Sequence, residues 1–170
     1  AYASERNGNW QLFLAKIARK EEANFPNATI IEEEVLLPSA TVERAYPQFS
    51  PDGKELAFIE ERNRLMVINL DTKKVRQITD GSTWFSTDGN FDYQWSPDGK
   101  WFTLEFIGNR HDPYSDIGLV SAKGDSPITN LTNSGYMSGS PRWVLDGNAI
   151  LFTTERYGMR AHASWGSQND

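Results

Sequence analysis

A five-residue segment, Ser-Pro-Asp-Gly-Lys, occurs twice in this 170-residue chain, at positions 50–54 and 96–100. An altered third copy reads Val-Leu-Asp-Gly-Asn at positions 144–148. The aspartates of the three copies are 46 and 48 residues apart, and each copy lies between an aromatic residue and an apolar run. Proline fixes φ at the first corner of a tight turn, and glycine takes the left-handed conformation that closes it. The segment therefore predicts a β-hairpin that recurs with the period of a repeat protein.

The turn residues of this segment have a structural and a chemical interpretation. Three recurring carboxylates would resemble a binding or catalytic set, but the flanking proline and glycine are turn formers. Each aspartate is then expected to bond its own local backbone. We therefore assign a structural role in the turns to Asp52, Gly53, Asp98, Gly99, Asp146 and Gly147.

A second repeated element, Glu-Arg or a looser version of it, follows the second strand of each predicted hairpin. Its arginines are separated by 56, 48 and 46 residues, so four repeats are represented. The repeats cover about residues 1–45, 46–91, 92–137 and 138–170. Such a pattern predicts an all-β fold, a β-propeller fragment of about four blades, each a four-stranded antiparallel sheet. The whole chain, 1–170, would be one propeller segment.

The terminal blades are expected to be incomplete. The first repeat begins at its second strand and the fourth stops in its third, which predicts a fragment of a longer chain. Unpaired strand edges expose main-chain N–H and C=O groups that recruit other strands. We therefore expect an open arc of blades that self-associates through its ends, or else frayed terminal strands.

Composition excludes several classes of partner. The net charge of −6 argues against nucleic acid, because phosphate binding needs a basic surface. The chain has no cysteine, which excludes disulfides and thiolate metal sites. No apolar run approaches the roughly 20 residues that cross a bilayer. No motif for a cofactor is present, so none is expected.

Other candidates for chemistry match no standard site. His111 with Asp112 and Asp116 has neither the spacing nor the number of ligands of a known metal site. The segment 88–92 contains half of a calcium-loop pattern and lacks the downstream glutamate. His162 is near Ser164 in sequence only, and no nucleophile elbow is present. We expect no catalytic residue, metal site or cofactor site in this chain.

The arginines of the second element are the remaining candidates for binding. A ring of arginines on one propeller face would hold a peptide carboxylate. The alternative is ordinary exposed ion pairing with the neighbouring glutamates, which is common and weak. The candidate peptide-contact residues are Arg6, Arg62, Arg110 and Arg156.

The repeats resemble the WD40-like (PD40) repeats of TolB-type and tricorn-type propellers. The resemblance rests on Tyr-Pro-Gln-Phe-Ser-Pro-Asp-Gly-Lys at 46–54, on Asp-Ile-Gly-Leu-Val at 116–120, and on the pairs Ile78-Thr79 and Leu131-Thr132. The last repeat, from Ser140 onward, is most similar to the propeller of bacterial tricorn-like S41 serine peptidases. In that family the catalytic serine and its partners lie in a later domain, so no catalytic residue is carried over to this chain.

The resemblance implies a non-catalytic propeller segment of a tricorn-like serine peptidase, which guides or gates the access of peptide substrates. The alternative is a TolB-like propeller that binds proteins in an envelope complex. Either implies a peptide or protein partner and a periplasmic or otherwise exported location, with the cytoplasm as the other possibility. A peptidase domain encoded after residue 170 would decide between the two. A small hydrolase is disfavoured because no nucleophile–base pair is visible.

Overall fold

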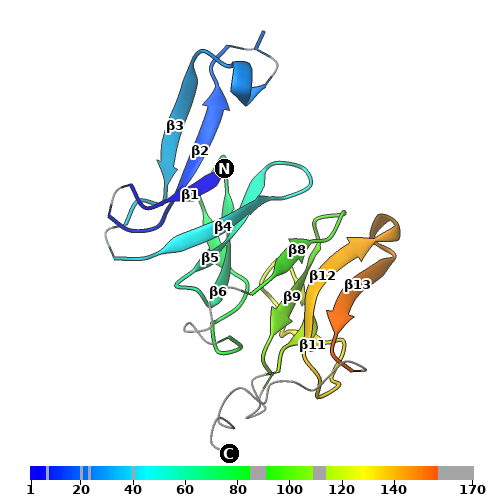
Figure 1. Ribbon diagram of the computed structural model, residues 1–170. Helices are drawn as coiled ribbons and strands as arrows, with labels where there is room; N and C mark the ends of the chain where they lie inside the picture. The colour runs from blue at the N-terminus through cyan, green and yellow to red at the C-terminus, as the bar shows by residue number, and fades with distance from the viewer. Residues whose placement is uncertain are drawn as a thin grey trace, which may run out of the picture. The chain divides into compact units, whose positions relative to one another are not determined.

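The computed structural model describes residues 1–6, 8–19, 21–22, 24–39, 41–84, 91–108 and 114–156. The chain divides into two compact units, Ala1–Asn90 and Phe91–Asp170. Each unit contains two antiparallel sheets (Figure 1). Helical structure in the described ranges is limited to two three-residue 3-10 turns, η1 (Phe25–Asn27) and η2 (Leu145–Gly147). The all-β fold predicted from the repeats is confirmed.

The first unit has a three-stranded sheet, ordered β1-β2-β3, and a four-stranded sheet, ordered β4-β5-β6-β7. Strands follow one another in sequence order, as predicted for propeller blades. Their bounds are Tyr2–Ser4 (β1), Gln11–Ile17 (β2), Ile31–Leu36 (β3), Arg44–Phe49 (β4), Glu55–Glu60 (β5), Arg64–Asn69 (β6) and Val75–Gln77 (β7).

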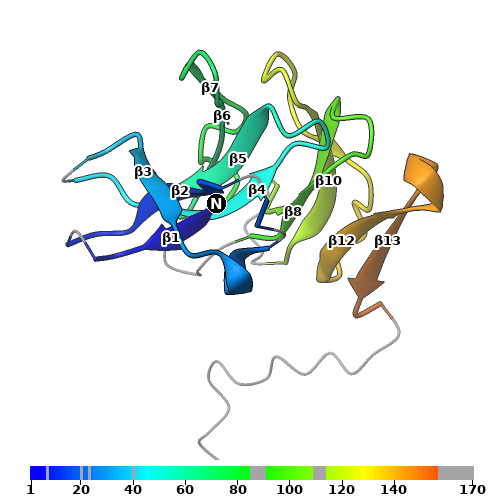
Figure 2. The same ribbon diagram turned by 90° about the horizontal axis from the view of Figure 1, so that it is seen from above.

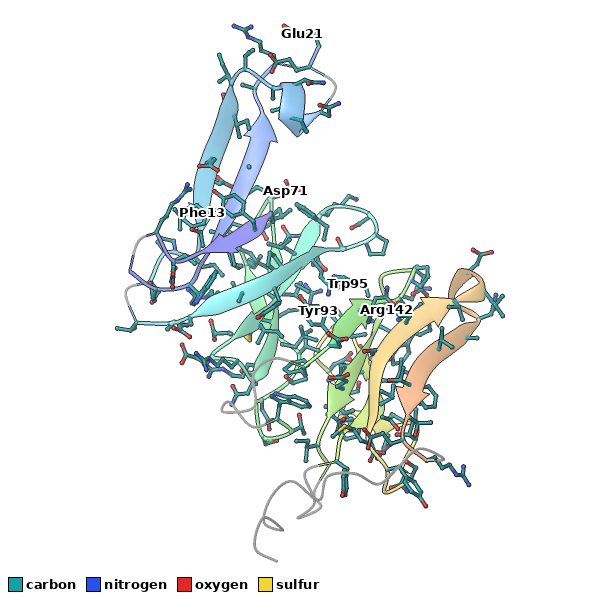
Figure 3. The ribbon with its side chains drawn as sticks, in the orientation of Figure 1. Phe13, Glu21, Asp71, Tyr93, Trp95 and Arg142 are labelled. Carbon is teal, nitrogen blue, oxygen red and sulfur yellow. The ribbon has the colours of Figure 1, made fainter. Side chains whose placement is uncertain are left out.

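The second unit repeats this plan. Its four-stranded sheet is ordered β8-β9-β10-β11, and β12 pairs with β13 in a two-stranded sheet (Figure 2). The bounds are Tyr93–Trp95 (β8), Trp101–Phe106 (β9), Asp116–Ser121 (β10), Thr129–Asn130 (β11), Ser138–Val144 (β12) and Ala149–Thr154 (β13). Tyr93 and Trp95 lie on β8 (Figure 3), and both are buried.

The turn between β4 and β5 is built by Ser50 and Asp52. The Ser50 hydroxyl donates to the Asp52 carboxylate at 2.7 Å and accepts from the main-chain N–H of Glu55 at 3.0 Å. Asp52 also accepts from the main-chain N–H of Lys54 at 3.1 Å. These bonds, that of the Ser50 hydroxyl first, hold the pKa of the Asp52 carboxyl below its ordinary value. The carboxylate thus serves the turn itself.

The turn between β8 and β9 has the same bonds. Ser96 donates to Asp98 at 2.6 Å and accepts from the N–H of Trp101 at 3.0 Å. Gly53 and Gly99 both have a φ of 70°, the left-handed conformation expected from the sequence.

The altered copy between β12 and β13 forms a different turn. Leu145, Asp146 and Gly147 all have positive φ, at 53°, 54° and 87°, and make the 3-10 turn η2. Leu145 stands where the other copies have proline, whose ring holds φ near −65°. Without that ring the chain reverses through left-handed residues. Asp146 and Gly147 therefore lie in a turn, but not in the same turn as their counterparts.

A buried cluster joins the two sheets of the first unit. Its fully or nearly fully buried members come from strands of both sheets: Leu12, Leu14, Leu36, Leu56, Phe58 and Ile68. Strand β1 lies against β4, so the second strand of one blade contacts the first strand of the next. Burial of these side chains is the main favourable term that holds the blades face to face.

The same contact between blades occurs in the second unit, where β9 lies against β12. Here Glu105 of β9 bridges the strands: its carboxylate accepts from the main-chain N–H of Ser140 at 2.7 Å and from that of Asp92 at 3.2 Å. Burial raises the pKa of the Glu105 carboxyl, and the bonds from Ser140 and Asp92 oppose that rise. Gly139 makes room for this carboxylate, since a Cβ there would lie 2.7 Å from Glu105 Oε1.

Replacing Gly53 with alanine should lower the free energy of unfolding by about 1 kcal/mol, because the left-handed backbone disfavours a side chain. A Cβ at this position would meet no atom within 4 Å, so the cost is conformational alone. Urea unfolding measures it. Gly108→Ala is the control, because position 108 lacks a positive φ and its Cβ would make only a 3.8 Å contact with Phe106. Equal effects of the two changes would contradict the strained-turn account.

Glu105 should give the unfolding free energy a distinct pH dependence. Its raised pKa means that the folded protein holds the proton more tightly than the unfolded chain does. Its contribution to stability therefore falls as pH rises from its ordinary value of 4.5 through the raised folded value. Glu105→Gln removes this titration, so the stability of the native chain relative to the variant should be greater at pH 4 than at pH 7. Asp125→Asn controls for the change in net charge, and a greater difference at pH 7 would refute the prediction.

Candidate functional site

A groove of 540 Å³ lies in the first unit, where β1 meets β4. Its apolar lining consists of Ala3, Trp10, Ala45, Tyr46, Pro47 and Ile59. Its charged lining consists of Glu43, Arg44 and Arg62. The volume is in the range of small-molecule and short-peptide sites, and the mixture of aromatic and charged groups is typical of them.

Hydrogen bonds of Arg44 fix one wall of the groove. The N–H of Arg44 donates to the carbonyl of Trp10 at 2.9 Å, which brings the start of β4 beside the residue preceding β2. The Arg44 side chain is mostly buried and is fixed by bonds to Glu60 at 2.9 Å and to the carbonyl of Leu37 at 2.6 Å. Arg44 shares the Glu60 carboxylate with Arg64, which lies 3.3 Å from it, and the buried, bonded side chain of Arg44 is a structural member of the lining.

Arg62 is the more available cation of the groove. Its side chain is 56% exposed, and its Nε lies 3.7 Å from Glu43, a loose ion pair. The loop that carries it is anchored, because Glu61 donates its N–H to the carbonyl of Glu43 at 3.0 Å and its carboxylate accepts from the N–H of Glu43 at 2.8 Å. Arg62 is therefore held at the groove by its backbone while its guanidinium stays accessible.

The backbone of two lining residues is in an uncommon conformation. Tyr46 and Arg62 have φ of 57° and 66°, although neither is glycine. Tyr46 and Pro47 form a β-bulge, in which both oppose Phe58 of the neighbouring strand. Such residues cost free energy and concentrate at functional sites. Trp10 and Tyr46 are 41% and 53% exposed, so the bulge presents aromatic surface to the solvent beside the groove.

The arginines singled out from the sequence do not share one environment. Arg62 lines the groove. Arg6 lies over the ring of Phe13, 3.9 Å from its centroid, and pairs with Glu33 at 2.9 Å, so it is a packing residue of the first blade. Arg156 is exposed just after β13 in the second unit. Arg110 lies outside the described residues.

Most of the residues considered for metal or acid–base chemistry also lie outside the described ranges: His111, Asp112, His162, Ser164 and residues 88–90. Asp116, the described member of the first set, is buried and accepts from Thr132 at 2.6 Å and from Asn130 at 2.8 Å. Its bonds to Asn130 and Thr132 join β10 to β11 and to the residues that follow β11. No cluster of possible metal ligands occurs among the residues described.

Sequence reasoning missed most of the groove. Trp10 and Glu43 belong to no repeated motif, and Ala3 is an unremarkable residue within a predicted strand. The usable signal was Tyr46-Pro47 ahead of the turn segment, because proline within a strand indicates an edge or a bulge.

None of the helical segments in the described part has the length and apolar character of a membrane-spanning helix.

Comparisons with known proteins agree with this fold. A curated relative, the uncharacterized peptidase YuxL of Bacillus subtilis (strain 168), is 29% identical to this chain over 119 residues. That match covers 68% of this chain and 18% of the relative, so the chain spans under a fifth of that protein.

Two solved structures have the same fold. A TolB protein from Agrobacterium tumefaciens matches with a TM-score of 0.53 and 21% identity, over 72% of this chain and 41% of that one. The tricorn protease matches with a TM-score of 0.56 and 16% identity, over 74% of this chain and 12% of that one. Both likenesses establish the β-propeller fold.

The family match covers more than half of the chain. Residues 11–110 match the family described as the dipeptidyl peptidase IV (DPP IV) N-terminal region. This range runs from β2 through β9 and includes both intact Ser-Pro-Asp-Gly turns. The chain belongs to the dipeptidyl peptidase IV N-terminal region family, with the fold of the propeller part of peptidase-like proteins.

Proposed function

We propose that this chain is a non-catalytic propeller segment of a peptidase, and that its groove holds peptide substrate and guides it to an active site elsewhere in the protein. The observation that carries the proposal is the groove between β1 and β4, which combines exposed Trp10 and Tyr46 with the loosely paired Arg62. Aromatic surface and an accessible cation suit a peptide, because aromatic rings pack against its apolar side chains and a guanidinium donates to its carbonyl and carboxylate oxygens.

Two kinds of parent protein are candidates. The last repeat resembles tricorn-like S41 peptidases, and the tricorn protease shares the fold. The matched family takes its name from dipeptidyl peptidase IV, and the curated relative is also named a peptidase. The sequence of the catalytic domain in the full-length protein decides between them. A peptide-guiding role is common to both proposals.

The groove should retain short peptides. We expect the immobilised protein to retain some of the peptides in a tryptic digest of casein. The Trp10→Ala variant should retain at least tenfold less peptide, because it loses aromatic contact with the ligand. Trp101→Ala is the matched control, because Trp101 is also 41% exposed but lies on β9 in the second unit. Equal losses in the two variants, or retention of intact proteins but no peptides, would contradict a peptide groove. The second result would favour the TolB-like alternative.

The chain alone should not hydrolyse peptides. Its sequence contains neither a nucleophile elbow nor a metalloprotease motif, so nothing is expected to activate a hydroxyl or a water molecule. Incubation of the pure chain with fluorescein-labelled casein should release no more dye than buffer does. Steady release that disappears in Ser164→Ala would show that the chain carries its own active site.

A further inference from the structure

The groove in the first unit and the Glu105 bridge in the second unit occupy equivalent places in the repeat. Strand register establishes the equivalence. Ala3 pairs with Leu12, and Glu105 pairs with Ile117. Leu12 and Ile117 are each the second residue of the third strand of their blade. In both cases the residue comes from the second strand of one blade and faces the first strand of the next. The second unit thus places a carboxylate where the first unit has only a methyl group.

The strand that faces this position is also equivalent in the two units. Ala45 of β4 and Gly139 of β12 each precede a β-bulge, formed by Tyr46-Pro47 in one case and Ser140-Pro141 in the other. Tyr46 and Ser140 have nearly the same φ, 57° and 52°. The two bulges therefore have the same backbone form, and in the second unit the N–H of Ser140 donates to a glutamate side chain from the neighbouring blade.

We propose that the groove of the first unit binds the carboxylate of a glutamate-type side chain supplied by a peptide ligand. The ligand carboxylate would lie at the bulge, as that of Glu105 does in the second unit. This inference rests on the proposed peptide-binding function and adds the chemistry of the ligand. The chain itself thus contains an intramolecular example of the contact.

Charge at the groove favours the same ligand. Of the two lining arginines, Arg44 is mostly buried and bonded to Glu60, whereas Arg62 is 56% exposed and only loosely paired with Glu43. A carboxylate that enters the groove gains a charge-assisted hydrogen bond from an exposed guanidinium. A neutral amide of the same shape gains much less. The groove should therefore discriminate between glutamate and glutamine at one position of a peptide.

The first experiment compares two labelled peptides that differ in one group. Fluorescein-labelled Gly-Ala-Glu-Ala-Gly amide and its glutamine counterpart are titrated with the chain, and fluorescence anisotropy gives the dissociation constants. Both are amidated, so the terminal carboxylate plays no part. We expect the glutamate peptide to bind at least tenfold more tightly. Arg62→Gln should remove most of that preference, whereas Lys54→Gln, which removes an exposed charge from the turn of the same unit, should leave it.

A second experiment recreates the arrangement of the second unit in the first. The double variant Ala3→Glu/Ala45→Gly introduces both the carboxylate and the small residue that faces it. This built-in carboxylate should compete with the ligand and weaken binding of the glutamate peptide at least tenfold. Gln77→Glu, which adds a carboxylate to an exposed position of β7 outside the groove, should bind nearly as well as the native chain. Circular dichroism and thermal unfolding verify that each variant is folded.

The outcomes separate this inference from the proposed function. If both peptides bind equally and Trp10→Ala weakens both, the groove binds peptides but the carboxylate inference is wrong. If neither peptide binds and the casein digest is also not retained, the peptide-binding function is itself wrong. If the glutamate peptide is preferred but the preference survives both Arg62→Gln and the double variant, the carboxylate is bound elsewhere and the inference fails.

Discussion

Each complete blade depends on one serine hydroxyl that bonds both a carboxylate and the main chain. In the turn between β4 and β5, Ser50 donates to Asp52 and accepts from the N–H of Glu55. The bonds close the turn from within and fix the register at which β5 leaves it, because a slip of one residue would break them. Register decides which side chains face the core. Both faces of β5 are buried, so the geometry of the turn decides that Leu56 and Phe58 enter the cluster shared with the first blade while Ala57 and Ile59 lie on the other face.

Because the turn residues determine the strand register locally, part of the fold could be predicted from the sequence. The turn, the order of strands and the left-handed glycines Gly53 and Gly99 follow from residues adjacent in sequence, so the repeats were sufficient to predict them. The reversed turn at Leu145 was missed because loss of one proline permits a conformation that the motif forbids. The groove was missed for another reason. Its lining comes from β1, β4, β5, the residue before β2 and the loop that carries Arg62, and no pattern along the chain relates Ala3 to Tyr46.

The arginines illustrate the same limit. Arg6 and Arg62 hold corresponding positions in their repeats, and the sequence treats them alike. Their environments differ because the first blade offers Arg6 an aromatic face at Phe13 and a carboxylate at Glu33, whereas Arg62 has only the loose pair with Glu43. A repeat specifies where a side chain leaves the backbone, but the neighbouring residues decide whether it packs or remains available to a ligand.

The bulge at Tyr46-Pro47 divides β4 into two parts with different structural roles. Two residues oppose Phe58 there, so the alternation of side chains along the strand is interrupted between Ala45 and Gln48. Residues before the interruption line the groove, and those after it lead into the Ser50 turn. Substitutions at 45 and 46 can therefore alter what the groove accepts without disturbing the pairing that follows. In a propeller that repeats the same bulge in β12, recognition can diverge from blade to blade while the scaffold stays constant.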